Sequence, residues 1–175
     1  DTWTVRTAAC SPTTPGNFCD AWTVFATSQA FDGNLGGISG ADAKCQAAAN
    51  NATDTAGNPR PLHGTYVAWI SHDKTDPPAT SSRYINNRSS GLGYRLVDGS
   101  LIASSWPDLT NGWLTNKSWI DVNENGGTSA RNESGDSGAL GRNSGHSSIE
   151  GYWTDMGADT TCSFDSNLYC FQNSK

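Results

Sequence analysis

The sequence has few charged and few apolar residues for its length of 175. Charged residues make up 16% and hydrophobic residues 35% of the chain, and both values are low for a cytoplasmic domain. Glycine, with 19 copies, and small polar residues take their place, and they favour turns over long helices. Seven tryptophans still provide large apolar groups to bury, which argues against disorder. The composition predicts one compact, loop-rich domain that contains β-structure.

Basic runs and long apolar segments are both absent. Lys and Arg number 11 against 17 Asp and Glu, which gives a net charge of −6. This average field repels nucleic acid and anionic membrane surfaces. No stretch approaches the ~18 apolar residues that span a bilayer, so we expect no membrane insertion. Neutral glycans, cationic proteins and divalent cations remain as classes of partner, and the oligomeric state stays open.

None of the five cysteines belongs to a C-x-x-C pair, so zinc-ribbon and thioredoxin-like sites have no support. Their spacing suits disulfides formed in an oxidising compartment. Any one of the five cysteines can be unpaired, and the other four can pair in three ways, so the sequence alone leaves every disulfide scheme open. The chain begins at Asp1 rather than Met, and removal of an export signal is the simplest explanation. We therefore expect a secreted or cell-surface protein. The cysteines are Cys10, Cys19, Cys45, Cys162 and Cys170.

Local patterns predict the main helix at residues 39–51. Alanines are frequent there, and Ser39 can cap the first turn. Asp42 would lie in that first turn, where the helix dipole favours an anion. Cys45 would then lie on the helix and need a distant partner.

Strands are predicted where β-branched and aromatic residues gather. Asp98-Gly99 stands between two apolar runs and predicts a hairpin with a tight two-residue turn. Polar composition predicts loops at 72–90 and 121–148. An N-terminal arm, 1–21, closed by a short Cys10–Cys19 loop, would precede one domain at 22–175. The predicted strands are 22–27, 65–71, the two arms of 94–103, 151–154 and 167–171, with a helical turn within 104–114.

Four segments, at 25–50, 63–71, 94–109 and 167–172, resemble in this order the bacterial endostatin-like domains, a branch of the C-type lectin-like fold. The most specific blocks are GADAKC, which ends at Cys45, and LYC, which ends at Cys170. The resemblance covers roughly residues 22–172. It implies an α+β fold, a C-type lectin-like, endostatin-like fold with mixed antiparallel sheets, one main helix and long irregular loops.

The resemblance also implies a disulfide between Cys45 and Cys170. The family has a second bridge in its C-terminal half, to which Cys162 corresponds at one end. The other end would fall within 121–148, which contains no cysteine. Cys162 is therefore either a free thiol or a partner of one of the two N-terminal cysteines.

Residues 121–126 fit D-x-N-x-N-G, the opening of a calcium-binding loop, in which alternate oxygens surround a hard cation. The predicted ligands are Asp121, Asn123 and Asn125. The full motif needs a bidentate Glu at position twelve, where this chain has Asn132. A polar turn after a strand is the favoured alternative, and calcium stays a hypothesis.

Four tryptophans of the loop-rich half alternate with polar residues and predict a surface for stacking sugars or protein groups. Sugar-binding members of the lectin fold use Glu-Pro-Asn or Gln-Pro-Asp tripeptides, which are absent here. WTD at 153–155 is a partial match to their Trp-Asn-Asp. Burial in the core is the alternative for any single tryptophan. The predicted ligand-binding residues are Trp106, Trp113, Trp119, Trp153 and Asp155.

GDSG at 135–138 matches the surroundings of a serine protease nucleophile. His72, Asp108 and Ser137 follow the His-Asp-Ser order, but 65 residues are too few for the strands between the His and the Ser. We therefore predict a non-catalytic binding module that recognises a glycan or an extracellular protein. A small secreted serine hydrolase and a purely structural envelope module are the alternatives.

Overall fold

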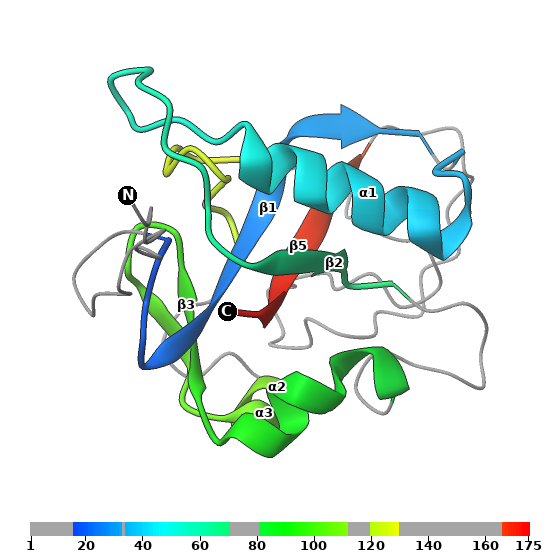
Figure 1. Cartoon of the computed structure of the whole chain (residues 1–175), viewed down its shortest axis with the longest axis vertical. Coiled ribbons are helices and arrows are strands. Elements are labelled where there is room, and N and C mark those ends of the chain that lie inside the picture. The colour runs from blue at the N-terminus through cyan, green and yellow to red at the C-terminus, as the bar shows by residue number, and fades with distance from the viewer. Residues whose placement is uncertain (1–15, 33, 71–80, 112–119, 130–165) are drawn as a thin grey trace, which may run out of the picture.

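The structure is a computed structural model, and it describes residues 16–32, 34–70, 81–111, 120–129 and 166–175 (Figure 1). These residues form an α+β arrangement around one mixed, five-stranded sheet. The strands are β1 (Ala21–Phe31), β2 (Thr65–Ala68), β3 (Gly93–Leu96), β4 (Leu101–Ala103) and β5 (Ser166–Ser174). The helices are α1 (Gly37–Asn50), the 3-10 helix η1 (Ser82–Tyr84), α2 (Ile85–Ser90) and α3 (Trp106–Leu109).

The order of the strands in the sheet is β2-β5-β1-β3-β4. β5 is antiparallel to both of its neighbours, β2 and β1. β3 is parallel to β1, and β4 completes the sheet as the antiparallel partner of β3. The predicted α+β class is therefore confirmed. No helix in the described ranges is both long enough and apolar enough to cross a membrane.

One face of the sheet is covered by α1. Phe25 and Cys170 are opposite each other in the β1–β5 pair, so their side chains lie on the same face. The side chains that α1 buries are Ala41, Cys45 and Ala49, spaced four residues apart. Because these side chains are small, the helix axis can lie close to β2 and β5.

The opposite face carries an aromatic core. Phe171 follows Cys170 in β5 and therefore points to the other side of the sheet. Its ring centre is 4.7 Å from that of Trp69, which lies 5.0 Å from Tyr84 and 5.8 Å from Trp106. Tyr84 belongs to η1 and Trp106 to α3, so the short helical segments complete this side of the core.

A buried disulfide joins α1 to β5. Cys45 and Cys170 are bonded to each other, with Cα atoms 5.5 Å apart and a sequence separation of 125. This pairing confirms what the family resemblance implied for these two residues. Cys19 is also disulfide-bonded, while Cys10 and Cys162 lie outside the described residues.

The start of α1 differs from the prediction. The helix begins at Gly37 with Gly36 as its N-cap, and no side chain caps it. The predicted cap by Ser39 is therefore wrong. Asp42 lies beyond the first turn, where it pairs with Arg83 instead of acting on the helix dipole.

The β3–β4 hairpin is confirmed, but its turn is not the predicted one. A tight two-residue turn of that kind needs positive φ at both Asp98 and Gly99, and only Gly99, at 92°, has it. The Gly99 amide donates to the Leu96 carbonyl (2.8 Å), and the Leu96 amide donates to the Ser100 carbonyl (2.9 Å). The turn is thus a longer loop that ends in a left-handed glycine. The predicted polar loop 72–90 contains η1 and α2 in its described part.

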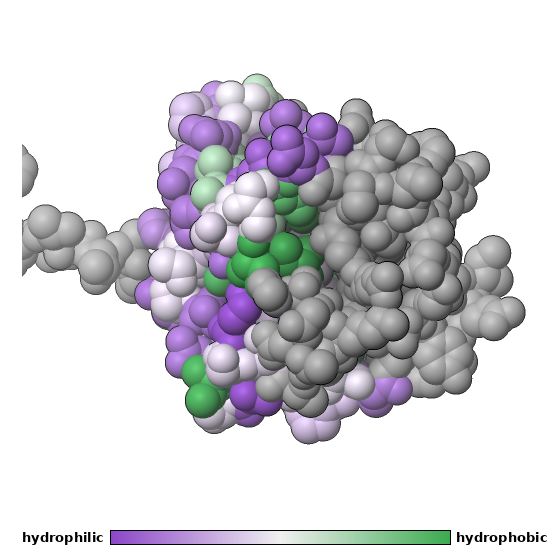
Figure 2. Space-filling model, turned by 90° about the vertical axis from the view of Figure 1, so that its right-hand side faces the viewer, coloured by the Kyte–Doolittle hydropathy of each residue, from purple (hydrophilic) through white to green (hydrophobic). Residues whose placement is uncertain are grey.

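Few large apolar side chains of the described residues are exposed at the surface. Figure 2 shows the side at the right of Figure 1, where hydrophobic surface borders the residues drawn in grey and hydrophilic surface surrounds the rest. Among the described side chains, Ile85 is the large hydrophobic one that stands out, at 58% exposed. The predicted arm 1–21 is described only from residue 16, and there Phe18 and Ala21 are buried. The predicted strand 151–154 lies outside the described residues.

Candidate functional site

Residues 120–129 form a small hairpin, here called the 120–129 hairpin, beside the second half of β1. Val122 accepts a hydrogen bond from the Ala26 amide (3.0 Å) and pairs with Thr128 in a short antiparallel bridge. The register of β1 against β5 shifts between Ala26 and Ala30. Amides alternate between the two sides of a strand, so the Ala26 amide faces the hairpin on the side of β1 away from β5. The hairpin contains every residue of the predicted calcium site.

The turn of the 120–129 hairpin is held by Asn123. Its carboxamide oxygen accepts hydrogen bonds from the amides of Asn125 (3.0 Å) and Gly127 (3.1 Å). The main-chain amide of Asn123 donates to the Gly127 carbonyl (2.8 Å), and its main-chain carbonyl accepts from the Gly126 amide (2.9 Å). An asparagine side chain that bonds to the backbone two residues ahead favours a turn. The polar turn that the sequence predicted as an alternative is therefore present.

Asn125 and Glu124 attach the hairpin to two distant parts of the chain. The carboxamide oxygen of Asn125 accepts from the amide (2.8 Å) and the hydroxyl (3.1 Å) of Thr53, just after α1. The carboxylate of Glu124 accepts from the amide of Ser28 (2.8 Å) and from its hydroxyl, in β1. Glu124 is only 6% exposed. These two hydrogen bonds attach the hairpin to β1.

These contacts bear directly on the predicted calcium site. A carboxamide oxygen has two lone pairs, and the oxygens of Asn123 and Asn125 each accept two hydrogen bonds. The main-chain carbonyl of Asp121 accepts from the Ser129 amide (2.6 Å). No three His, Cys, Asp or Glu side chains form a metal-binding group within the described part of the chain. The asparagine oxygens are thus engaged as hydrogen-bond acceptors in this structure, and calcium binding stays a prediction for titration.

Thr27 connects both ends of the segment 130–165. Its carbonyl accepts a hydrogen bond from the hydroxyl of Ser129 (3.1 Å) before the segment and from the carboxamide of Asn167 after it. Its hydroxyl accepts from the Leu168 amide (2.9 Å). Thr27 is 1% exposed, so its position is set by packing on all sides. The segment therefore leaves and rejoins the described fold at the same place on β1.

Trp106 belongs to the core rather than to an exposed stacking surface. It is 8% exposed, and its ring centre lies 5.9 Å from Tyr84 and 6.3 Å from Tyr94. Aromatic pairs at such distances stabilise a core beyond their buried area. The prediction that Trp106 binds a ligand through an exposed ring is therefore wrong. The other predicted ligand residues, Trp113, Trp119, Trp153 and Asp155, lie outside the described residues.

The hypothetical triad is represented in the structure by Asp108 alone, because His72 and Ser137 lie outside the described residues. The Asp108 carboxylate accepts from the amide (2.6 Å) and hydroxyl (3.0 Å) of Ser104. Its amide donates to the hydroxyl of Ser105, the N-cap of α3 (3.3 Å). These contacts give Asp108 a structural role at the start of that helix.

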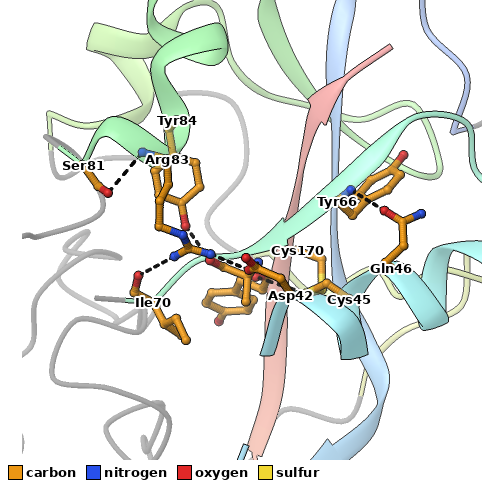
Figure 3. A network of polar contacts seen from close by, with 11 residues as sticks. Asp42, Cys45, Gln46, Tyr66, Ile70, Ser81, Arg83, Tyr84 and Cys170 are labelled. Carbon is orange, nitrogen blue, oxygen red and sulfur yellow. Dashed lines mark hydrogen bonds and ion pairs between the residues drawn. A yellow bond between two sulfur atoms is a disulfide. The ribbon is translucent and has the colours of Figure 1, made fainter. Parts of the chain in front are cut away.

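A second polar cluster, which the sequence analysis missed, lies along the outer edge of β2 (Figure 3). The Asp42 carboxylate accepts from the Ala68 amide (2.9 Å) and pairs with Arg83. The Gln46 carboxamide oxygen accepts from the Tyr66 amide (2.8 Å). We call Asp42, Gln46 and Arg83 the edge cap. Polar residues four apart on one side of a helix were the available signal, but nothing in the sequence names the strand that they meet.

Comparison with known proteins adds no name to these sites. No protein-family model matches the chain, and no curated protein matches it in sequence. The resemblance to endostatin-like domains therefore stays a prediction.

Proposed function

We propose that the chain is a secreted or cell-surface binding module without catalytic activity, of the C-type lectin-like, endostatin-like kind. The observation that carries the proposal is the buried disulfide between Cys45 and Cys170. Disulfides form and persist in oxidising compartments, which supports a location outside the cytosol. The same bond joins the two blocks on which the family resemblance mainly depends.

The binding surface is proposed to lie in the loops of the half 104–155. Ligand-binding residues occur disproportionately on loops that a rigid scaffold positions. The 120–129 hairpin, which belongs to this half, is part of such a scaffold, because Glu124 and Asn125 anchor it to Ser28 and Thr53. Thr27 holds both ends of the segment that follows. These contacts support loops that start from a fixed base.

A neutral glycan is the ligand class that the composition favours. The net charge of −6 disfavours polyanionic glycans. Tryptophan rings provide flat apolar surfaces with a polar edge, and Trp113, Trp119 and Trp153 remain the predicted stacking residues once Trp106 is assigned to the core. An extracellular protein is the other class of ligand, and the experiment below separates the two.

A glycan array probed with the whole chain, with and without calcium, tests the proposal. We expect binding to neutral glycans that is lost in Trp113→Ala/Trp119→Ala. Ile85→Ala is the matched control, because Ile85 is an exposed apolar side chain on α2, outside the predicted surface. Dependence on calcium would show that the ion contributes to the binding.

Three results would contradict parts of the proposal. Absence of binding to every glycan, with or without calcium, would remove the glycan and favour a protein ligand or a structural module. Equal loss in the Ile85 control would show that the effect is not specific to the loops. Labelling of Ser137 by a fluorophosphonate would refute the non-catalytic assignment.

A further inference from the structure

Among the described strands, β2 lies at an edge of the sheet, and side chains bind its outward amides. Along an antiparallel strand, each residue directs both its amide and its carbonyl to one side, and the next residue directs them to the other side. Val67 is paired with Phe171 of β5, on the inner side. The amides of Tyr66 and Ala68 point outward, where an unpaired edge is a template for another strand.

The edge cap provides acceptors at the spacing of the strand. Gln46 binds the Tyr66 amide (2.8 Å), and Asp42 binds the Ala68 amide (2.9 Å). Four residues of an α-helix advance by about 6 Å, and two residues of a strand by about 6.8 Å. Side chains four apart on α1 can therefore follow alternate amides of β2, as Figure 3 shows for this pair. Side chains of α1 thus take the hydrogen-bonding positions at these two amides that a sixth strand would take.

Donors cover the carbonyl groups of the same edge. The guanidinium of Arg83 donates to the Ile70 carbonyl (3.1 Å), and the Tyr84 hydroxyl donates to the Ala68 carbonyl. Arg83 also forms the ion pair with Asp42, and their side chains are 17% and 28% exposed. Side chains thus cover the outward amides of Tyr66 and Ala68, the Ala68 carbonyl, and the Ile70 carbonyl just beyond β2.

The side chains that α1 buries are small, and one of them forms the disulfide. The side chains that it buries are Ala41, Cys45 and Ala49, which have little apolar area to remove from water. A helix of 14 residues is marginal by itself in water. The bond from Cys45 to Cys170 lies between Asp42 and Gln46 on the helix, at the middle of the edge cap. The covalent bond therefore holds the cover in place.

The strand beneath the cover has the composition of a self-pairing segment. Residues 65–70, TYVAWI, are β-branched, aromatic or small, and they include no charge, proline or glycine. Such six-residue segments pair readily with identical copies when they become exposed. A charged or glycine-containing edge would not have this property.

We infer that α1 is a removable cover of β2, locked by the Cys45–Cys170 disulfide, and that reduction allows β2 to pair antiparallel with β2 of a second copy of the chain. A dithiol reductant breaks the S–S bond. Two electrons and two protons pass to the cysteines, which become thiols, while the two thiols of the reductant join as a disulfide. Tyr66 of one copy then faces Ala68 of the other, with Val67 opposite Val67.

This geometry is tested by cross-linking in a chain that lacks the lock. Cys45→Ala/Cys170→Ala is prepared with Val67→Cys or, as the matched control, with Thr65→Cys. Across the proposed two-fold axis, residues 67 form a non-hydrogen-bonded pair with Cα atoms about 4.5 Å apart, which suits a disulfide. Residues 65 would lie about 14 Å apart along the strands. We expect a dimer by sedimentation, with a 67–67 cross-link and no 65–65 cross-link by peptide mapping.

Wild-type protein is expected to be monomeric when oxidised and to dimerise after treatment with a dithiol. If the variant without the lock loses its near-ultraviolet circular dichroism, the same cross-linking is done on Asp42→Ala/Gln46→Ala. That variant keeps the disulfide but releases two edge amides, so dimerisation is expected at higher concentration. A folded chain that stays monomeric in both backgrounds, or one that cross-links equally through 65 and 67, would overturn the inference.

Discussion

Removal of the Cys45–Cys170 disulfide should have a large effect on stability. The bond closes a loop with a sequence separation of 125. In the chain-entropy model, opening a loop of that length stabilises the unfolded state by roughly 5 kcal/mol at 25 °C. Domains of ordinary stability have a free energy of unfolding of about 5–15 kcal/mol. Cys45→Ala/Cys170→Ala is therefore expected to lose between a third and all of its stability.

Urea unfolding followed by tryptophan fluorescence measures this loss directly. We expect a lower midpoint and a steeper dependence on urea, because an unfolded chain without the cross-link is more expanded and exposes more surface. The wild-type chain unfolded in the presence of a reductant is the matched control and should follow the variant unfolded with the same reductant. The reductant is needed in both samples because it also opens the disulfide of Cys19.

A loss below about 1 kcal/mol would refute the entropic reasoning, since the model requires several times more for a loop of this length. Peptide mapping that finds Cys45 and Cys170 alkylated without prior reduction would remove the premise itself. A loss confined to the midpoint, with an unchanged urea dependence, would place the effect in the folded state instead.

Three further predictions concern single-residue substitutions. Burial raises the pKa of Tyr66 and of Tyr94 above the ordinary value of 10. Above pH 10 the unfolded chain therefore releases protons that the folded chain keeps, so the free energy of unfolding should fall as the pH rises. Urea unfolding from pH 9 to 11 should show a smaller fall in the two Tyr→Phe variants. Gly57→Ala, at φ 84° with open space around it, should lose only the backbone strain of about 1–3 kcal/mol. Gly64→Ala should lose more than this in urea unfolding, because φ is 92° and an added Cβ would also lie 2.0 Å from a main-chain oxygen of β5. Trp106→Ala should cost about 3–5 kcal/mol in thermal or urea unfolding, since the ring is part of the core, and glycan binding per folded molecule should not change.

The regular elements were predictable where local composition and packing agree. β1 contains the predicted 22–27, and α1 covers most of the predicted 39–51. The 3-10 helix η1 could not be predicted from a polar sequence, because Tyr84 is buried through contacts with the distant rings of Trp69, Trp106 and Phe171. Such contacts join residues far apart in the chain, and periodicity within a short window does not report them.

The candidate site was predictable as a turn and not as a docked hairpin. Asn123 closes its turn with neighbours four residues away or fewer, and a D-x-N-x-N-G pattern is a local signal of that kind. The attachment of Asn125 to Thr53 spans 72 residues, and that of Glu124 to Ser28 spans 96. The burial of Trp106 has the same origin, because exposure depends on which other rings meet it.

The place of β5 has a consequence for how the chain is made. β5 begins at Ser166 and lies between β2 and β1, so β2 lacks its neighbour in the sheet, and β1 lacks one of its two, until residues 166–174 have been synthesised. Cys170 emerges at the same late moment, and Cys45 waits for it through more than a hundred residues of synthesis. The pairs that β5 forms with β1 and β2 thus join residues far apart in the sequence, an arrangement that slows folding. Synthesis of residues 166–174 therefore precedes both the pairing of β2 and the closure of the Cys45–Cys170 bond.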